Sequence, residues 1–211
     1  MKIFIPTNRH HILNEIHPEI RENAIIKDGT NVKCYSAMIN ECLAECADED
    51  IIVICADRMR PKGEEDLFRM INLINEGYGF VGLYRFGFYA LHMDAVRRVG
   101  PLDERYIKGT YEDGDYMRRF MEADIAFYEA EDIRVVDILS NFNPSNTQLA
   151  INHFKNKWDH IDGTCIRLLK EEKYNYNFGE DSGKVFLPWD RSVVFKHSEN
   201  FKNFKFKDMS K

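Results

Sequence analysis

The sequence predicts an α/β fold in which helices cover both faces of a mixed, mostly parallel central sheet. Five apolar residues from Ile51 to Cys55 are typical of a strand buried on both faces. The segment Lys2–Pro6 reads as a second buried strand, and stretches with apolar residues at helical spacing lie between the strand-like segments. The chain has 211 residues, enough for one substantial core, so we expect one domain.

In the first third of the chain, a third, short strand is predicted over Ala24–Lys27, between the two buried strands in the sequence. The segment His10–Glu22 has helical spacing, and Pro18 must interrupt or begin a helix there. A further helix is predicted before the strand at Ile51. Ser36 is available as its N-cap, and its apolar stripe ends at Cys46. The resulting strand, helix, strand, helix, strand order favours a nucleotide-binding α/β layer.

The later elements follow from the same reasoning. Gly77 is the expected C′ residue of a helix over Leu67–Ile74, and Asp94 the expected cap of a short helix that Gly100 ends. A further helix begins at Tyr111–Asp115. The remaining predicted strands are Phe80–Tyr84, Phe88–His92, Ile125–Tyr128 and Ile133–Ile138, and the remaining predicted helices are Thr147–Trp158 and Cys165–Lys173. The end of the chain, from Phe204, is expected to be a tail or a cut between domains.

Composition limits the classes of function. A net charge of -6 argues against a nucleic-acid surface, and a net acidic protein needs a local cation or a bound metal to hold a phosphate group. No apolar run approaches membrane-spanning length and none resembles a signal peptide, so we expect a cytoplasmic protein. The five cysteines, at 34, 42, 46, 55 and 165, are expected to be reduced. Cys42 and Cys46 are one helical turn apart and could share a zinc ion, although buried thiols fit the pattern better.

Asp57 is the first candidate for a functional residue. It follows the Ile51–Cys55 strand directly, and the loop after the first strand, Pro6 to Arg9, is expected at the same edge of the sheet. Ligands of open α/β sheets bind at the carboxyl ends of the strands, where a carboxylate can hold a metal ion or a ribose. The alternative is structural: Asp57 opens a turn that Pro61 ends.

A second candidate is the acidic cluster of Glu112, Asp113 and Asp115. Acidic residues favour helix N-termini for structural reasons alone, but one carboxylate suffices for a cap. The cluster therefore suggests a base or a partner for a metal ion. We expect Asp113, with Glu112, to act as the base, since like charges can raise the pKa of one member. Asp137, at the end of a strand, is a weaker candidate whose alternative role is a turn.

The order of these motifs resembles the GT-A glycosyltransferases, in particular the family 2-like group. The resemblance covers about Lys2 to Trp158, is most specific between Gly100 and Asp115, and includes Lys157-Trp158. A looser resemblance is to the first domain of larger glycosyltransferases encoded by chlorella viruses. The other segments that carry the family resemblance are Pro6-Thr-Asn-Arg9, Lys27-Asp-Gly-Thr30, Ser36-Ala to Asn40-Glu-Cys-Leu43 and Ile52-Val-Ile-Cys-Ala-Asp57.

The resemblance implies a division of residues 1–211 into three parts: a nucleotide-sugar-binding half (1–100), an acceptor and catalytic half (101–160) and a helical or irregular C-terminal extension (161–211), after which further domains can follow. It implies a uridine diphosphate (UDP) sugar as donor and a Mn²⁺ or Mg²⁺ ion. Asp57 would be the second carboxylate of the family's Asp-x-Asp metal motif, with Cys55 in place of the first. Asp137 lies where many relatives have a metal-binding His, and its carboxylate is an equally suitable ligand. The residues implied at the donor are Pro6, Thr7, Asn8, Arg9, Asp28, Asp57 and Arg58.

The function expected from the residues and the resemblance together is metal-dependent transfer of a sugar to an acceptor hydroxyl on a glycan or another small molecule. A divalent ion would neutralise the diphosphate leaving group, and a carboxylate would take the acceptor's proton. A nucleotidyltransferase of similar fold is one alternative, although the loop after the first strand lacks the glycines expected for it. A non-catalytic module that binds nucleotide sugars is the other, and turnover of a nucleotide sugar excludes it.

Overall fold

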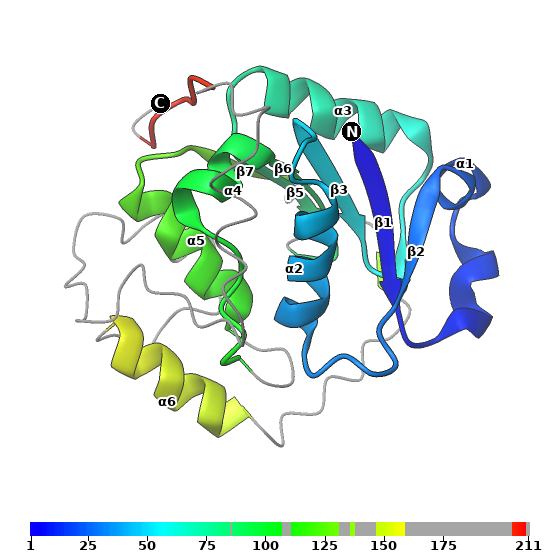
Figure 1. The fold of residues 1–211 in the computed structure, drawn as a ribbon. Coiled ribbons are helices and arrows are strands. Elements are labelled where there is room, and N and C mark those ends of the chain that lie inside the picture. The colour runs from blue at the N-terminus through cyan, green and yellow to red at the C-terminus, as the bar shows by residue number, and fades with distance from the viewer. Residues whose placement is uncertain (85, 107–110, 131–135, 138–146, 159–203, 210–211) are drawn as a thin grey trace.

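The central sheet of the protein has six strands in the order β2-β1-β3-β6-β5-β7 (Figure 1). The computed structural model describes residues 1–84, 86–106, 111–130, 136–137, 147–158 and 204–209. Strand β6 is antiparallel to both of its neighbours, and the other neighbouring pairs are parallel, so the predicted mixed, mostly parallel sheet is confirmed. The strands are β1 (Lys2–Thr7), β2 (Ala24–Asp28), β3 (Ile51–Cys55), β5 (Phe80–Tyr84), β6 (Phe88–His92) and β7 (Phe127–Glu129).

Strand β3 lies in the interior of this sheet, as its apolar run predicts. All five of its residues are buried, because β1 and β6 pair with its two edges and helices cover both faces. Its side chains alternate between the two faces, so Ile52 and Ile54 belong to one core cluster and Val53 and Cys55 to the other. A strand that is covered on both faces can be apolar at every position.

Helices lie on both faces of the sheet, as predicted. Helices α2 (Tyr35–Glu45), α4 (Met93–Val99) and α5 (Glu112–Glu122) supply apolar side chains to one core cluster. Helix α3 (Glu64–Asn75) supplies them to the other, together with residues of and next to α1 (Pro18–Glu22) and the 3₁₀ helix η1 (His10–Glu15). In Figure 1, α2, α4 and α5 stand in front of the sheet.

A second sheet consists of two short strands, β4 (Met59–Arg60) and β8 (Val136–Asp137). They are antiparallel, with Asp137 in register with Met59. Of the strand predicted over residues 133–138, these two residues are described, and they pair with the turn after β3 rather than with the main sheet. The predicted helix at Thr147–Trp158 is confirmed as α6.

Two of the predicted helix caps are wrong. Helix α2 begins at Tyr35 after an extended Cys34, so Ser36 lies inside the helix, where its Oγ is buried without a hydrogen-bond partner among the described residues. Helix α4 is capped by His92, whose Nδ1 accepts the backbone N–H of Asp94 at 3.1 Å. Asp94 instead binds Arg97 within the first turn of α4. The other boundaries named above, Pro18, Gly77 and Gly100, are confirmed, and Gly77 has a φ of 110° after α3.

The segment Phe204–Met209 is bound to the domain, so the expectation of a loose tail is wrong for these residues. The Phe204 N–H donates to Asp94 Oδ2 at 2.7 Å, and the Lys207 N–H donates to the Gly77 carbonyl at 2.9 Å. The Lys207 carbonyl accepts the Ala126 N–H at 2.8 Å. Phe206 and Met209 pack against the core. The helix predicted over residues 165–173 lies outside the described residues.

Cys34, Cys42, Cys46 and Cys55 are buried free thiols, and the fifth cysteine, at 165, lies outside the described residues. Within the part of the chain that the structure describes, no helix is both long and apolar enough to cross a membrane.

Candidate functional site

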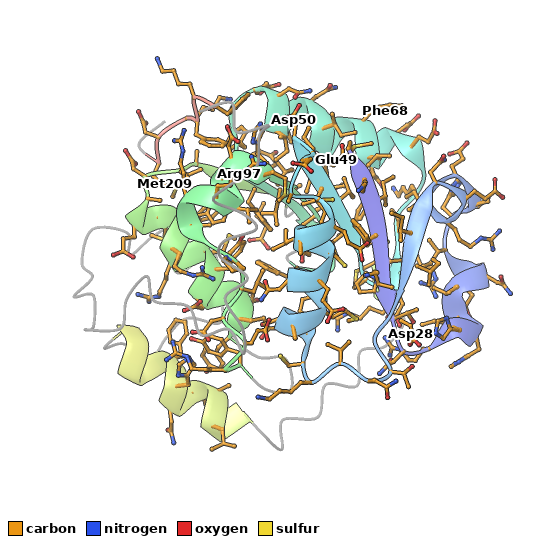
Figure 2. All side chains as sticks on the ribbon, viewed as in Figure 1. Asp28, Glu49, Asp50, Phe68, Arg97 and Met209 are labelled. Carbon is orange, nitrogen blue, oxygen red and sulfur yellow. The ribbon has the colours of Figure 1, made fainter. Side chains whose placement is uncertain are left out.

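The carboxyl ends of β1, β2 and β3 meet at one edge of the sheet, and most of the predicted donor residues lie there. Thr7 and Asp28 are directly paired in the register of β1 and β2. Asp57 comes two residues after the end of β3, which is parallel to β1. Figure 2 shows Asp28 at this end of the sheet. We call this edge, with Thr7, Arg9, Asp28 and Asp57, the donor edge.

Asp57 is the centre of a hydrogen-bonded group at the donor edge. Its Oδ2 accepts the Thr7 hydroxyl at 2.7 Å and the Arg9 Nε–H at 3.1 Å, while its Oδ1 accepts an N–H from Arg9 Nη2. The hydroxyl of Thr7 in turn accepts the backbone N–H of Arg9 at 2.8 Å. A carboxylate held by a forked guanidinium has a defined orientation. Two segments predicted separately from the sequence, the loop after β1 and the residue after β3, therefore meet at the Asp57 carboxylate.

Asp57 does more than open a turn. The turn after β3 is closed by the Met59 N–H to the Ala56 carbonyl at 2.8 Å, and Arg60 donates to the Asp57 carbonyl at 2.7 Å. The hydrogen-bond partners of the Asp57 side chain, Thr7 and Arg9, lie at the end of β1, fifty and forty-eight residues earlier in the chain. The side chain thus ties β3 to β1, and the turn has other stabilising bonds.

The remaining predicted donor residues differ in exposure. Asp28 is exposed and accepts the N–H and hydroxyl of Thr30, which lower its pKa, and His10 lies 3.5 Å away. These bonds form a local turn, so the structural alternative for Asp28 also has support. Asn8 is exposed, whereas Pro6 is buried. Thr7 is also buried, and its hydroxyl faces Asp57.

The residues predicted to bind the metal lie on neighbouring segments. Asp137 is opposite Met59 in β8, and Met59 is two residues after Asp57. The described residues contain no group of three or more His, Cys, Asp or Glu side chains arranged to hold a metal ion. Mg²⁺ sites in nucleotide enzymes often have one or two carboxylates, and phosphate oxygens and water complete the shell. Asp57 and Asp137 therefore stay the predicted ligands, on segments that the β4–β8 pairing brings together. Cys55, at the place of the first motif carboxylate, is fully buried in β3.

Glu112 and Asp113 form the first turn of α5, as predicted. Glu112 is only partly exposed, and its Oε2 is buried without a hydrogen-bond partner among the described residues. Burial raises the pKa of Glu112 to about 8, and the charge of Asp113 adds to the rise. Arg58 lies close enough to lower that pKa in part, which connects the loop after β3 to the start of α5. Glu112 is therefore protonated at neutral pH.

Asp115 differs from the half-buried Glu112 and Asp113 because it is paired inside the core, although its charge still adds to the rise in the pKa of Glu112. It is fully buried, and its Oδ2 accepts the Arg119 Nε–H at 3.2 Å. Tyr106 donates its hydroxyl to Asp115 Oδ1 at 3.4 Å. Arg119 also donates to the carbonyls of Val99 and Pro101, each at 2.7 Å. Asp115 is three residues after Glu112 and so lies on nearly the same face of α5, but its carboxylate is paired with Arg119, whereas Glu112 Oε2 is buried without a partner among the described residues.

Residues that the sequence did not single out hold the segment before α5 in place. Asn40, buried in α2, donates to the Leu102 carbonyl at 2.8 Å and to Glu104 Oε1 at 3.0 Å, and accepts the Leu102 N–H at 2.8 Å. Tyr35 donates its hydroxyl to the Phe86 carbonyl at 2.9 Å. An amide within an otherwise apolar helical stripe was the available signal for Asn40, because a buried amide needs partners.

The backbone at the start of α5 is also unusual. Tyr111 precedes Glu112 with a φ of 69°, a left-handed conformation that is uncommon for a residue other than glycine. Its ring contacts Phe154 of α6, with 5.3 Å between the ring centroids. Helix α6 therefore packs directly beside the Glu112–Asp113 turn.

Comparison with solved structures reveals the same fold in a known protein. The catalytic domain of Drosophila beta-1,4-galactosyltransferase 7, in complex with xylobiose, matches 68% of this chain and 71% of its own with a TM-score of 0.50 and 14% identity. A mutant of that enzyme with manganese, UDP-Gal and xylobiose matches 70% of this chain and 73% of its own, with a TM-score of 0.48 and 12% identity. No family model and no curated protein matches the sequence. This chain therefore has a glycosyltransferase fold of the GT-A-like α/β type.

Proposed function

We propose that this protein transfers a sugar from a nucleotide sugar, with UDP as the expected nucleotide, to a hydroxyl group of a glycan or another small acceptor. The observation that carries the proposal is the convergence of Arg9, Asp57 and Thr7 at the carboxyl ends of β1 and β3. Ligands of α/β sheets bind at this edge. The likeness to a galactosyltransferase catalytic domain supports the fold on which the proposal depends.

The donor would lie across the ends of β1 and β2. Asn8 and Asp28 present exposed polar groups there for the uracil and the ribose. Arg9 and Arg58 provide positive charge for the diphosphate on a protein whose net charge is -6. Thr7 and Pro6 are buried, so we assign them to support of this surface, with Thr7 acting through Asp57.

Asp57 and Asp137 are the residues we expect to hold a Mn²⁺ or Mg²⁺ ion. When bound, the ion would neutralise the charge that develops on the departing diphosphate. The two carboxylates supply hard oxygen ligands, which suit both ions. Chelation of the metal should therefore abolish transfer.

Asp113 is the candidate base for the acceptor hydroxyl. Its neighbour Glu112 is protonated at neutral pH because burial raises its pKa to about 8. Glu112 would then be neutral and leave Asp113 as the charged carboxylate for the incoming hydroxyl. Like charges were expected to raise the pKa of one member of this group; for Glu112, burial is the larger cause.

Release of UDP from a panel of UDP sugars, with Mn²⁺ present and with or without an acceptor, tests the proposal. Xylobiose is a first acceptor to try, since it is bound in the neighbour structure. Asp113→Asn should keep the fold and donor binding and lose roughly 2 to 4 orders of magnitude in turnover if the reaction inverts the anomeric configuration. Glu122→Gln removes an exposed carboxylate from the other end of α5 and is the matched control.

Two outcomes would contradict the proposal. Tight UDP binding without release of sugar from any donor would indicate a non-catalytic binding module. Wild-type turnover and acceptor affinity in Asp113→Asn would show that Glu112 and Asp113 have only a structural role at the start of α5. The virus-encoded source and the cytoplasmic location stay predictions.

A further inference from the structure

The Asp57 carboxylate is already bound to a cation, which is the guanidinium of Arg9. Both of its oxygens accept hydrogen bonds from Arg9, and Oδ2 also accepts the Thr7 hydroxyl. The Asp57 side chain is 6% exposed, so little of it is open to solvent in this arrangement. A divalent ion would need the same oxygens.

We propose that Arg9 and a divalent cation exclude each other at Asp57, and that a nucleoside diphosphate releases Asp57 by taking Arg9 onto its phosphate oxygens. Two cations within a few ångströms repel each other, and a forked guanidinium covers the face of the carboxylate that the ion would use. Phosphate is an equally good partner for the arginine fork. The release step rests on the proposed donor chemistry; the exclusion of metal by Arg9 does not.

The surroundings of Arg9 allow its side chain to move. The side chain is 37% exposed, and among the described residues its guanidinium makes hydrogen bonds to Asp57 alone. Its backbone N–H is fixed by Thr7, so the guanidinium can turn outward while the main chain stays in place. The guanidinium therefore has both the room to leave Asp57 and no second bond that opposes it within the described structure.

Exclusion at Asp57 makes metal and nucleotide binding depend on each other. The metal alone must displace Arg9 into water, which weakens its binding. When a diphosphate holds Arg9, Asp57 keeps the hydrogen bond from Thr7 but loses the competing cation, so the metal binds more tightly. By linkage the metal strengthens nucleotide binding by the same factor. Arg9 is thus a positioning residue for the metal as well as a phosphate ligand.

Binding of Mn²⁺ alone, followed by the loss of the free-ion electron paramagnetic resonance signal, tests the exclusion without any nucleotide. Arg9→Ala should bind Mn²⁺ at least about tenfold more tightly than the wild type, because a nearby positive charge and a competing ligand are both removed. The control Arg21→Ala removes the same charge from α1, where Arg21 bonds Asn14, and should bind Mn²⁺ as the wild type does. The double variant Arg9→Ala/Asp57→Asn should lose the gain.

Arg9→Gln covers the case in which Arg9→Ala fails to fold, because its amide can still donate to Asp57. Thermal melts followed by circular dichroism report the fold of each variant. Equal Mn²⁺ affinity in the wild type and a folded Arg9 variant would overturn the proposal, and so would the absence of Mn²⁺ binding in every variant. A gain in a folded Arg9 variant that Asp57→Asn removes supports it.

Addition of UDP tests the release step. UDP should raise the Mn²⁺ affinity of the wild type by a larger factor than that of Arg9→Ala or Arg9→Gln. An equal or larger factor in the variants would overturn the release of Asp57 by the diphosphate. If UDP does not bind the wild type at all, the proposed function fails, and the titration with Mn²⁺ alone still decides whether Arg9 excludes the metal.

Discussion

Two aspartate–arginine pairs lie at opposite edges of the sheet, and they differ in how completely they are enclosed. At the donor edge, Arg9 and Asp57 have side-chain exposures of 37% and 6%. At the opposite edge, Arg97 and Asp94 have exposures of 3% and 1%. Figure 2 shows Arg97 and Asp28 at these two ends of the sheet.

The partners of the two pairs explain the difference. Arg97 also donates to the Ala47 carbonyl, and Asp94 also accepts the Phe204 N–H at 2.7 Å, so each member of the enclosed pair has a second bond to another segment. The ring of His92 contacts that of Phe204, with 4.2 Å between centroids, and covers the same region. In the open pair, Asp57 also accepts the Thr7 hydroxyl, but within the described part of the chain the Arg9 guanidinium bonds to Asp57 alone. Both pairs therefore connect distant segments, and the pair whose arginine has no second bond among the described residues is the one for which we propose an exchange of partners.

The largest expected effect is on turnover at the open pair. Asp57→Ala should reduce sugar transfer by at least about four orders of magnitude, about 5 kcal/mol of transition-state stabilisation, because it removes both the metal ligand and the anchor of Arg9. Its cost in stability should be only about 1–2 kcal/mol, since Arg9 can turn to solvent. Turnover assays and urea unfolding on the same preparation measure both. Full activity in Asp57→Ala would contradict the assignment of the donor edge.

At the enclosed pair, we expect a large loss of stability and no loss of turnover. Asp94→Ala leaves Arg97 buried without its carboxylate and should lower the free energy of unfolding by about 3–5 kcal/mol. Turnover per folded molecule should stay at the wild-type value. Urea unfolding with activity normalised to the folded fraction checks this, and a loss of turnover that exceeds the unfolded fraction would remove the distinction between the two edges.

A pH-dependent effect is expected at Glu112, near the donor edge. Its pKa is raised to about 8 in the folded protein, so the folded state binds a proton that the unfolded state releases near its ordinary pKa. Stability should therefore fall as the pH rises between these two values, and it should be level below and above them. Turnover should also decline above about pH 8, as the proton is lost. Glu112→Gln should remove the pH dependence of both stability and turnover. If the variant has the same pH profiles as the wild type, another group is responsible for them.

The smallest expected effect is at the docked C-terminal segment. Phe204→Ala removes the ring that contacts His92 and Phe206 and should cost about 1–2 kcal/mol of stability. Donor affinity should not change, because the ring lies at the edge opposite Asp57. Calorimetric titration with UDP and a thermal melt check the two expectations together. A weaker UDP affinity in a folded Phe204→Ala protein would show that the two edges are coupled.

The sequence predicted features that depend on local pattern and could not predict those that depend on distant contacts. The strands β1, β2 and β3 and the position of Asp57 followed from apolar runs and the residues that end them. The Arg9–Asp57 pair could not follow from such patterns, since its members are forty-eight residues apart and meet only when β1 and β3 pair.

Most of the errors concerned which side chains are buried and which groups they bond to. Asp115 is three residues from Glu112, so the sequence placed it in one acidic group; what the sequence did not predict is that Asp115 is fully buried and paired with Arg119. Asp94 looked like a cap because acidic residues favour helix starts, yet the adjacent His92 has the capping geometry. The docking of Phe204–Met209 depends on backbone bonds to Gly77 and Ala126, which leave no local pattern in the sequence.

A crystal structure of the chain with UDP and Mn²⁺ tests the central claim most directly, namely that the open edge is the donor site. The account predicts UDP across the ends of β1 and β2 beside Asn8 and Asp28, anomalous scattering from manganese at the Asp57 carboxylate, and the Arg9 guanidinium turned from Asp57 to the diphosphate. Manganese and UDP at another part of the molecule, with the Arg9–Asp57 pair unchanged, would contradict it.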